Sequence, residues 1–442
     1  MRSDPPQPRP DTQSKDPAVP PTTVSPSSVS PSPTRAPRAV RHHRVLAPTL
    51  AVSDTAAAAV FRVVRQHGPL TRDAVTAATA LSTATVNRQV TALLAAGLLR
   101  ERADLVAAGA IGRPRVPVEV NAAPFVTLGV HIGATTTAIV ATDLLGRTLD
   151  AVETATPHGA QAAALATLAD RARHYLTRWR RRRPLWVGVA IGGAVDGATG
   201  RVDHARLGWA HAPVGATFAE ALGLPVSVAS HVDAMAGAEL LLGRRPVAEA
   251  GGATAPGATS LYVYARETVG YALMIGGRVH TPAAGPGTIA TLPADSELLG
   301  GSGQLESTVS DAAVLAAARR RRILPDGAAP AGLLRAARAG DGAAADLLAE
   351  RARVLGEAVA LLRDLLNPDD LVVGGQAFTE YPEGMELVAA AFSRRSVLAP
   401  RGIRVTAFGN KVQEAGAGVV SLSGLYADPI AAMRRTDAAT QV

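Results

Sequence analysis

The sequence predicts an α/β protein that carries a small, mainly helical module near its N-terminal end. Between residues 53 and 96, apolar side chains recur at helical spacing and are bounded by capping and turn residues. From residue 126 onward, short apolar β segments alternate with helical stretches, a pattern typical of α/β domains. With 442 residues, the chain is long enough for two or three globular units.

Composition narrows the class of protein. The chain has no cysteine, which excludes disulfides, thiolate zinc sites and a cysteine nucleophile. Its formal net charge of +8 favours a polyanionic partner. No apolar run reaches the ~18 residues of a membrane span, and the N-terminus lacks the apolar core of a secretory signal. We therefore expect a cytoplasmic protein with no membrane partner.

Both ends of the chain are predicted to be tails. Residues 1–45 are rich in Pro, Ser, Thr and Arg, and they offer too little apolar surface to offset the entropy of ordering. Their arginines could contact DNA phosphates, although a solvated tail is the simpler interpretation. Residues 431–442 are expected to be a flexible C-terminal tail.

The helical module is predicted over residues 46–122. Ser53 is the expected N-cap of its first helix, which Gly68-Pro69 would end. Thr71 is the expected N-cap of a second helix, which runs through Ala78.

A third helix is predicted from the N-cap Ser82 through Ala96. Its inward face is an apolar stripe of Val86, Val90, Leu93 and Leu94. Its opposite face carries Thr83, Thr85, Asn87 and Arg88. In a helix-turn-helix, these early positions of the second motif helix reach base edges in the major groove, where Asn pairs with adenine and Arg with guanine. The alternative is an ordinary polar face of a small helical domain.

A two-stranded wing is predicted from residues 98–101 and 116–120. The turn between them presents Arg113 and Arg115 among glycines and a proline. Such a thin basic turn fits a minor groove, where the negative potential favours arginine, although a basic loop in isolation is usually just solvated. The helix and the wing together predict contacts to double-stranded DNA from Ser82, Thr83, Thr85, Asn87, Arg88, Arg113 and Arg115.

Two segments resemble a known family: GPLTRDAVTAATALSTATVNRQVTALLAAGLLRE at 68–101 and IGRPRVPVEVNAAPFVTLGVHIGATTT at 111–137. They are similar to the start of the ROK regulators (repressor, open reading frame, kinase), in which a winged helix-turn-helix is joined through a Gly-Arg-Pro wing to a sugar-kinase-type domain. The resemblance implies a two-lobed, actin-like ATPase fold over residues 123–430. Within it, LNPDDLVVGGQAF at 366–378 resembles the adenosine-side strand and glycine pair.

Positions that the resemblance assigns to phosphoryl transfer carry other residues here. His131 stands for the Asp that helps hold magnesium, and Ala229-Ser230-His231 for the Glu-Asn-Asp triplet that contains the base. His231 could in principle act as a base, whereas Asp233, two residues along, is expected to face elsewhere. Arg266-Glu267-Thr268 replaces a Gly-Thr-Gly phosphate loop, and its glutamate would repel a triphosphate.

The zinc and sugar positions depart from the family pattern too. Thr291 stands for the zinc-binding His, the stretch 298–307 has no Cys, and Thr288 replaces a sugar-binding Glu. We therefore predict no metal and no cofactor, with a joint metal site of two cleft histidines, His131 and His231, as the minor alternative. The ligand-binding candidates that remain are Ser230, His231 and Glu306.

The resemblance implies a sequence-specific, DNA-binding transcriptional regulator that is a homodimer or higher homo-oligomer. Its kinase-like domain is expected to be no enzyme and to serve oligomerisation and the sensing of a small-molecule effector. One alternative is a sugar kinase that uses ATP to phosphorylate a hexose. Another is a protein-interaction scaffold without a DNA function.

Overall fold

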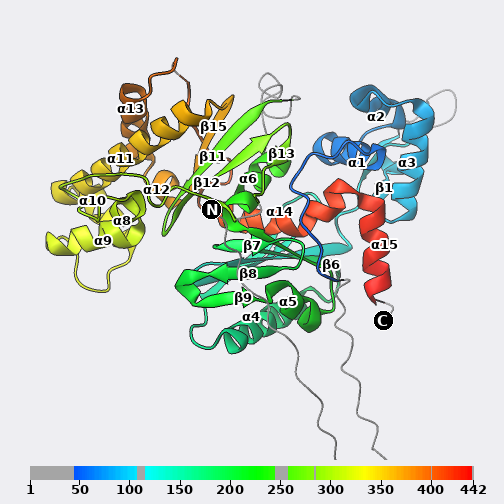
Figure 1. Ribbon diagram of the computed structural model, residues 1–442. Helices are drawn as coiled ribbons and strands as arrows, with labels where there is room; N and C mark the ends of the chain where they lie inside the picture. The colour runs from blue at the N-terminus through cyan, green and yellow to red at the C-terminus, as the bar shows by residue number, and fades with distance from the viewer. Residues whose placement is uncertain (1–43, 107–114, 244–256, 283–284, 400, 441–442) are drawn as a thin grey trace, which may run out of the picture. The chain divides into compact units, whose positions relative to one another are not determined.

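The computed structural model describes residues 44–106, 115–243, 257–282, 285–399 and 401–440 (Figure 1). These residues form an N-terminal module of helices and two short strands, followed by two α/β lobes. None of the described helices combines the length and the apolar composition that crossing a membrane requires.

The N-terminal module has the predicted helix-turn-helix order. Its elements are α1 (Ala56–His67), α2 (Arg72–Thr79), α3 (Thr83–Ala95), β1 (Leu99–Glu101) and β2 (Val118–Val120). Thr71 and Ser82 cap α2 and α3 through their hydroxyl oxygens, as the sequence predicts. The cap of α1 is Thr55 and not Ser53, since the Thr55 hydroxyl accepts the bond from the Ala58 N–H.

The predicted wing strands pair as expected. β1 and β2 are antiparallel, with Leu99 opposite Val120, and Leu70 bridges to Val118 on the other edge. Val86, Val90 and Leu93 of α3 are buried beneath them, while Leu94 is only partly buried. The helix faces predicted from apolar spacing are therefore those observed.

The first lobe is built on a five-stranded sheet in the order β10-β6-β3-β4-β5. Its strands are β3 (Phe125–Ile132), β4 (Thr136–Thr142), β5 (Thr148–Ala155), β6 (Arg183–Ile191) and β10 (Val226–Ser230). Its other elements are α4 (Gln161–Leu176), α5 (Val214–Leu222) and a small sheet of β7 (Ala194–Asp196), β8 (Arg201–His204) and β9 (Trp209–Ala212). Every residue of β3 is buried, as expected for a central strand.

The second lobe contains a sheet with the strand path β13-β12-β11-β15-β16, and β14 also pairs with β12. Its strands are β11 (Thr259–Ala265), β12 (Val269–Ile275), β13 (Arg278–Val279), β14 (Gly287–Thr288), β15 (Asp370–Gly374) and β16 (Arg404–Val405). Its helices are α8 (Leu305–Val309), α9 (Asp311–Arg320), α10 (Pro330–Arg338), α11 (Gly342–Leu366), α12 (Gln376–Thr379) and α13 (Met385–Arg395).

Two helices, α6 (His231–Leu242) and α14 (Val412–Ala427), pack against each other. α14 also lies directly on β3 and β6, because both strands have a glycine where it approaches. A Cβ at Gly129 would lie 2.7 Å from the Ala417 backbone, and one at Gly188 would lie 2.2 Å from the Ser421 nitrogen. Larger side chains at these two positions would push the helix off the sheet.

The N-terminal module is joined to the lobes through α1. The Arg65 guanidinium stacks 4.4 Å above the Tyr426 ring of α14 and donates a 2.8 Å hydrogen bond to the Leu241 carbonyl at the end of α6. Phe61 packs against the same tyrosine ring. These contacts make the cores of the module and of the central helices continuous.

Both ends of the described chain differ from the sequence-based expectation. Residues 44–53, here called the strap, do not belong to the N-terminal module, because Val45 pairs with Val226 of β10 and Ala51 pairs with Arg278 of β13. At the other end, most of the segment expected as a flexible tail is the helix α15 (Pro429–Thr440), which contacts α1, α3 and α14.

Candidate nucleic-acid interface and cleft

The outer face of α3 is the candidate nucleic-acid interface. Thr83, Asn87 and Arg88 are exposed on its N-terminal half. The Ser82 hydroxyl, by contrast, bonds the Thr85 N–H at 3.2 Å and the Thr85 hydroxyl at 2.9 Å. Ser82 and Thr85 therefore hold the start of the helix, and Thr83, Asn87 and Arg88 are left to face outward.

Arg72 fixes the angle between the two helices of the motif. From α2, its guanidinium donates to the Asn87 carbonyl at 3.2 Å and to the Thr91 hydroxyl at 3.4 Å. Because these bonds use the backbone of Asn87, its side-chain amide is not engaged by them. The Arg88 guanidinium forms no ion pair with any described residue.

The wing arginines differ in their partners. Arg100 and Arg102, on the strand β1 and just after it, both bond the Glu119 carboxylate. Arg115 forms a 2.9 Å ion pair with Asp73, whose side chain is 58% exposed. Such a surface pair is worth little, about 0–1 kcal/mol, so that Arg115 can exchange Asp73 for another anion. The predicted contact Arg113 lies outside the described residues.

Two stacked histidines lie where the first lobe meets β11 of the second. The rings of His131, at the end of β3, and His231, at the start of α6, are 6.1 Å apart and nearly parallel, and Tyr264 of β11 meets His231 edge-on at 5.4 Å. Desolvation lowers the pKa of His131 to about 3 and that of His231 to about 4. Both rings are neutral at pH 7, and His231 is a weak base.

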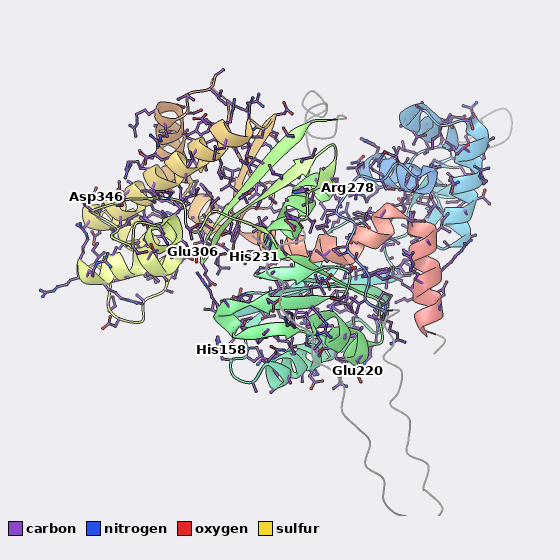
Figure 2. All side chains as sticks on the ribbon, in the orientation of Figure 1. His158, Glu220, His231, Arg278, Glu306 and Asp346 are labelled. Carbon is purple, nitrogen blue, oxygen red and sulfur yellow. The ribbon has the colours of Figure 1, made fainter. Side chains whose placement is uncertain are left out.

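A set of side-chain bonds, here called the clasp, joins the two lobes. Arg206, which follows β8 in the first lobe, forms an ion pair with Glu306 of α8 and donates to the Glu267 carbonyl at 3.1 Å. The Glu267 carboxylate accepts a 2.8 Å bond from the Thr135 hydroxyl of the first lobe. Figure 2 places Glu306 and His231 in the central part of the molecule. Glu306 is thus occupied by a partner from the same chain.

Ser230 lines a cavity that His231 and Glu306 do not line. It is buried and caps α6, accepting a 3.3 Å bond from the Asp233 N–H. Asp233, expected to face away from the cleft, lines a separate cavity together with Ser230. Among the described residues, no group of three His, Cys, Asp or Glu side chains is arranged to hold a metal ion.

Comparison with known proteins places the chain in a family. Residues 127–417 match the profile of the ROK family. Proteins named transcriptional regulators in Mycobacterium tuberculosis and Mycobacterium bovis are 71% identical to it over 410 residues, which is 90% of this chain and 92% of theirs. The chain belongs to the ROK family. Because the relatives that match nearly the whole chain are regulators, it is a ROK transcriptional regulator and the kinase alternative is not supported.

Solved ROK structures agree with this assignment at the level of the fold. A ROK family transcriptional regulator, described as a homologue of the E. coli MLC protein, covers 86% of this chain and 98% of its own with a TM-score of 0.69 at 21% identity. A ROK family glucokinase from Streptomyces griseus covers 67% of this chain and 99% of its own, with a TM-score of 0.55 at 23% identity.

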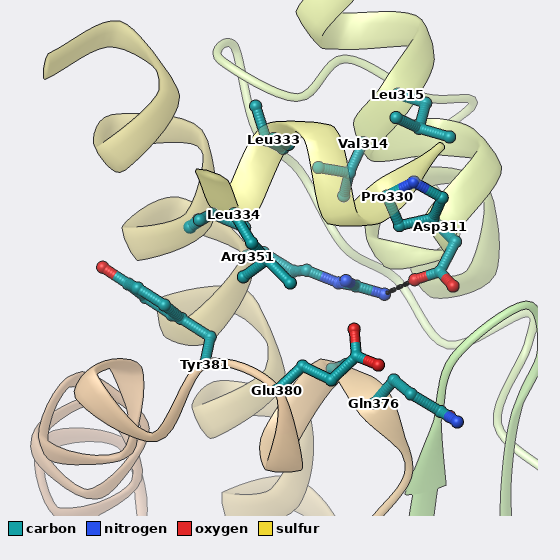
Figure 3. A pocket seen from close by; sticks show the side chains of 12 residues that line it. Asp311, Val314, Leu315, Pro330, Leu333, Leu334, Arg351, Gln376, Glu380 and Tyr381 are labelled. Atoms are coloured by element: carbon teal, nitrogen blue, oxygen red, sulfur yellow. Dashed lines mark hydrogen bonds and ion pairs between the residues drawn. The ribbon is translucent and has the colours of Figure 1, made fainter. Parts of the chain in front are cut away.

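Side chains leave little space next to the glycine pair that resembles the adenosine-side motif of the ROK family. Next to the glycine pair that ends β15, a cavity of about 20 Å³ is bordered by a buried ion pair between Arg351 and Asp311 at 2.7 Å (Figure 3). Burial and the nearby Asp311 raise the pKa of Glu380 in its wall. This volume holds about one water molecule and not a nucleobase.

The positions that correspond to the zinc motif of the ROK kinases carry no zinc-binding side chains here. Thr291 is exposed, and the loop that should carry cysteines is held by a 2.9 Å hydrogen bond between the hydroxyls of Ser302 and Ser307. Between them, Gly303 takes a left-handed backbone conformation. Hydroxyl and glycine residues do not fit a thiolate zinc site.

Sequence reasoning missed three parts of this region: the strap, Arg206 and the partnership of Glu306. The apolar segment LAPTLAV at 46–52, between the basic tail and the first helix, is the signal that could have indicated an ordered strap. Nothing in the sequence around Arg206 indicates a partner 100 residues away.

Proposed function

We propose that residues 56–120 of this ROK regulator bind double-stranded DNA, with α3 in the major groove and the wing in the minor groove. The observation that carries the proposal is the outward face of α3, where Thr83, Asn87 and Arg88 are exposed on a helix whose other face is buried. Asn and Arg are the side chains that make bidentate contacts with adenine and guanine.

The assembly and the second domain are part of the same proposal. A homodimer, or a higher homo-oligomer, would place two α3 helices on a near-palindromic site and double the contacts. The kinase-like lobes are not an enzyme in this proposal, because the clasp and the neutral histidines occupy the cleft where sugar and phosphates would have to lie. The lobes instead support oligomerisation and the sensing of a small effector.

A binding experiment on DNA fragments selected from genomic DNA tests the interface. We expect Arg113→Ala and Arg115→Ala to weaken binding to all fragments and each to lower the salt slope by about one, because they meet phosphates and the minor groove. Asn87→Ala and Arg88→Ala should instead relax base preference, by about 1–3 kcal/mol for each lost bidentate pair.

Arg394→Ala is the matched control, since Arg394 is exposed on α13 in the second lobe. Fluorescence anisotropy across a salt series, with a library of single-base changes in the bound site, separates the two classes of effect. If the four variants behave like Arg394→Ala, α3 and the wing are not the interface.

A further inference from the structure

The strap is seated on both lobes at once. The Leu46 N–H donates to the Val226 carbonyl of β10 at 2.8 Å, and the Val279 N–H of β13 donates to the Leu50 carbonyl at 2.9 Å. One extended segment thus adds hydrogen bonds to the edge of each main sheet.

Glycines make room for the strap side chains. A Cβ at Gly200 would lie 2.9 Å from the Val45 side chain, and one at Gly237 of α6 would lie 2.9 Å from that of Leu50. Leu50 is itself 6% exposed. Leu50 and Ala51 are therefore the buried part of the strap, and contacts to the two lobes fix its path.

Between the strap and the lobes lies a cavity of about 180 Å³. Its walls are mainly apolar, and its lining includes Pro48 and Leu50 of the strap, Val195, Val228, Thr281 and Asp233. A dry cavity of about 150 Å³ in another protein accommodates benzene, so that this one has room for a compact ring or branched molecule.

Asp233 is the one acidic group in the lining of this cavity. Asp233 is 2% exposed, and its Oδ2 atom has no hydrogen-bond partner among the described residues. Desolvation raises its pKa to about 6, so that most of it is ionised at pH 7. A buried carboxylate with one oxygen left unpartnered is costly, and a cation beside it would offset that cost.

We propose that this cavity binds a compact organic cation, a primary amine with an apolar body. The ammonium group pairs with the Asp233 carboxylate, and the body packs against Pro48 and Leu50. The site is separate from the old catalytic cleft, because His231 faces His131 and Tyr264 and does not line the cavity.

Two walls of the cavity lead to α1 of the DNA-binding module. The strap runs directly into the cap of α1 at Thr55, and α6, which carries Asp233, ends at the Leu241 carbonyl that Arg65 of α1 bonds. Resting on the proposed function, we infer that the bound amine changes DNA affinity by about fivefold or more, a usual size for coupling between sites.

Calorimetric titration of the full chain with cyclohexylamine tests the site without DNA, and cyclohexanol serves as its neutral isostere. The wild type should bind the amine at least about tenfold more tightly than the alcohol, since only the amine pairs with a carboxylate. Asp233→Asn should lose that preference. Asp346→Asn should keep it, because Asp346 is exposed on α11 and labelled in Figure 2 at the far end of the second lobe.

A second variant, Thr281→Trp at the exposed rim, should block the amine without altering the buried carboxyl. Equal amine affinity in the wild type and Asp233→Asn, or no binding to the wild type, overturns the site. Amine binding without any change in the Kd for DNA overturns the coupling. A chain that binds the amine but no DNA refutes the proposed function and leaves the cavity assignment standing.

Discussion

At the scale of single residues, His131 is a buried ring at the end of β3. His131 is 4% exposed, and its Nε2 atom has no hydrogen-bond partner among the described residues. Desolvation, followed by the nearby His231 and Arg266, lowers its pKa from 6.5 to about 3. The side chain is therefore held in the native state as an uncharged ring.

This histidine makes stability depend on pH in a defined direction. Its folded-state pKa is below its unfolded-state value, so that the unfolded chain binds the extra proton between about pH 6.5 and 3. Its contribution is complete above pH 6.5 and is lost as the pH falls, by about 2 kcal/mol at pH 5. We expect His131→Gln to lose less stability than the wild type between pH 7 and pH 5, measured by urea unfolding.

Carboxylates and other histidines titrate in both proteins, and their effects cancel in the comparison. His158→Gln is the matched control, since His158 is exposed in the loop before α4. An identical loss of stability in the wild type and His131→Gln would show that the ring is accessible to protons in the folded state.

Single residues differ in how far the sequence predicts their partners. The N-caps Thr71 and Ser82 were predictable because a cap bonds a residue two or three positions along the same chain. The clasp partner of Arg206 was not, because Glu306 is brought to it only by the folding of two separate lobes. Local bonds leave a sequence signature, whereas contacts between lobes leave very little.

At the scale of elements, the strap bridges to the edges of two sheets, and its contribution to stability can be measured. Leu50 is buried against Gly237. Leu50→Ala should lower the free energy of unfolding by about 2–4 kcal/mol, because it removes buried methyl groups and leaves a cavity. Guanidinium unfolding of the full chain measures this loss.

Leu365→Ala makes the same chemical change where the side chain is 69% exposed at the end of α11. It should alter stability by no more than about 0.5 kcal/mol. A Leu50→Ala protein as stable as Leu365→Ala would mean that the strap does not hold the lobes in solution.

Helices and strands also differ in how well the spacing of their apolar residues predicts their position and buried face. The apolar stripe of α3 gave its buried face correctly, because a helix repeats its faces every few residues. The strap pairs at only a few positions with strands far along the chain, and α15 is amphipathic only over a short length. Sequence patterning alone therefore indicated a tail at residues 431–442 and assigned most of the strap to the DNA-binding module.

At the scale of the whole molecule, side chains of the first lobe bond the second lobe directly. The Arg206 and Thr135 side chains of the first lobe both bond Glu267 of the second. Phosphoryl transfer requires a positioned base, a metal ion and phosphate donors in the same cleft. We expect no sugar-dependent ATP turnover by the wild type across a panel of hexoses and N-acetylated hexosamines.

His231→Asp should be inactive as well. It restores a carboxylate at the base position but leaves Glu267 where the triphosphate would lie. Coupled ADP release, with an active sugar kinase assayed in parallel, measures this. Turnover by the wild type that depends on a sugar would restore the enzyme hypothesis, and turnover by His231→Asp alone would show that the base was the one missing part.

The position of the strap in the chain also bears on the order of synthesis. It leaves the ribosome before any helix of the DNA-binding module, yet its partners Val226 and Arg278 are translated much later. N-terminal domains fold first during translation. The module can therefore fold before the strands that hold the strap, β10 and β13, have been translated. A nascent chain would therefore complete the helices of the N-terminal module before the two residues that hold the strap, Val226 and Arg278, have been made.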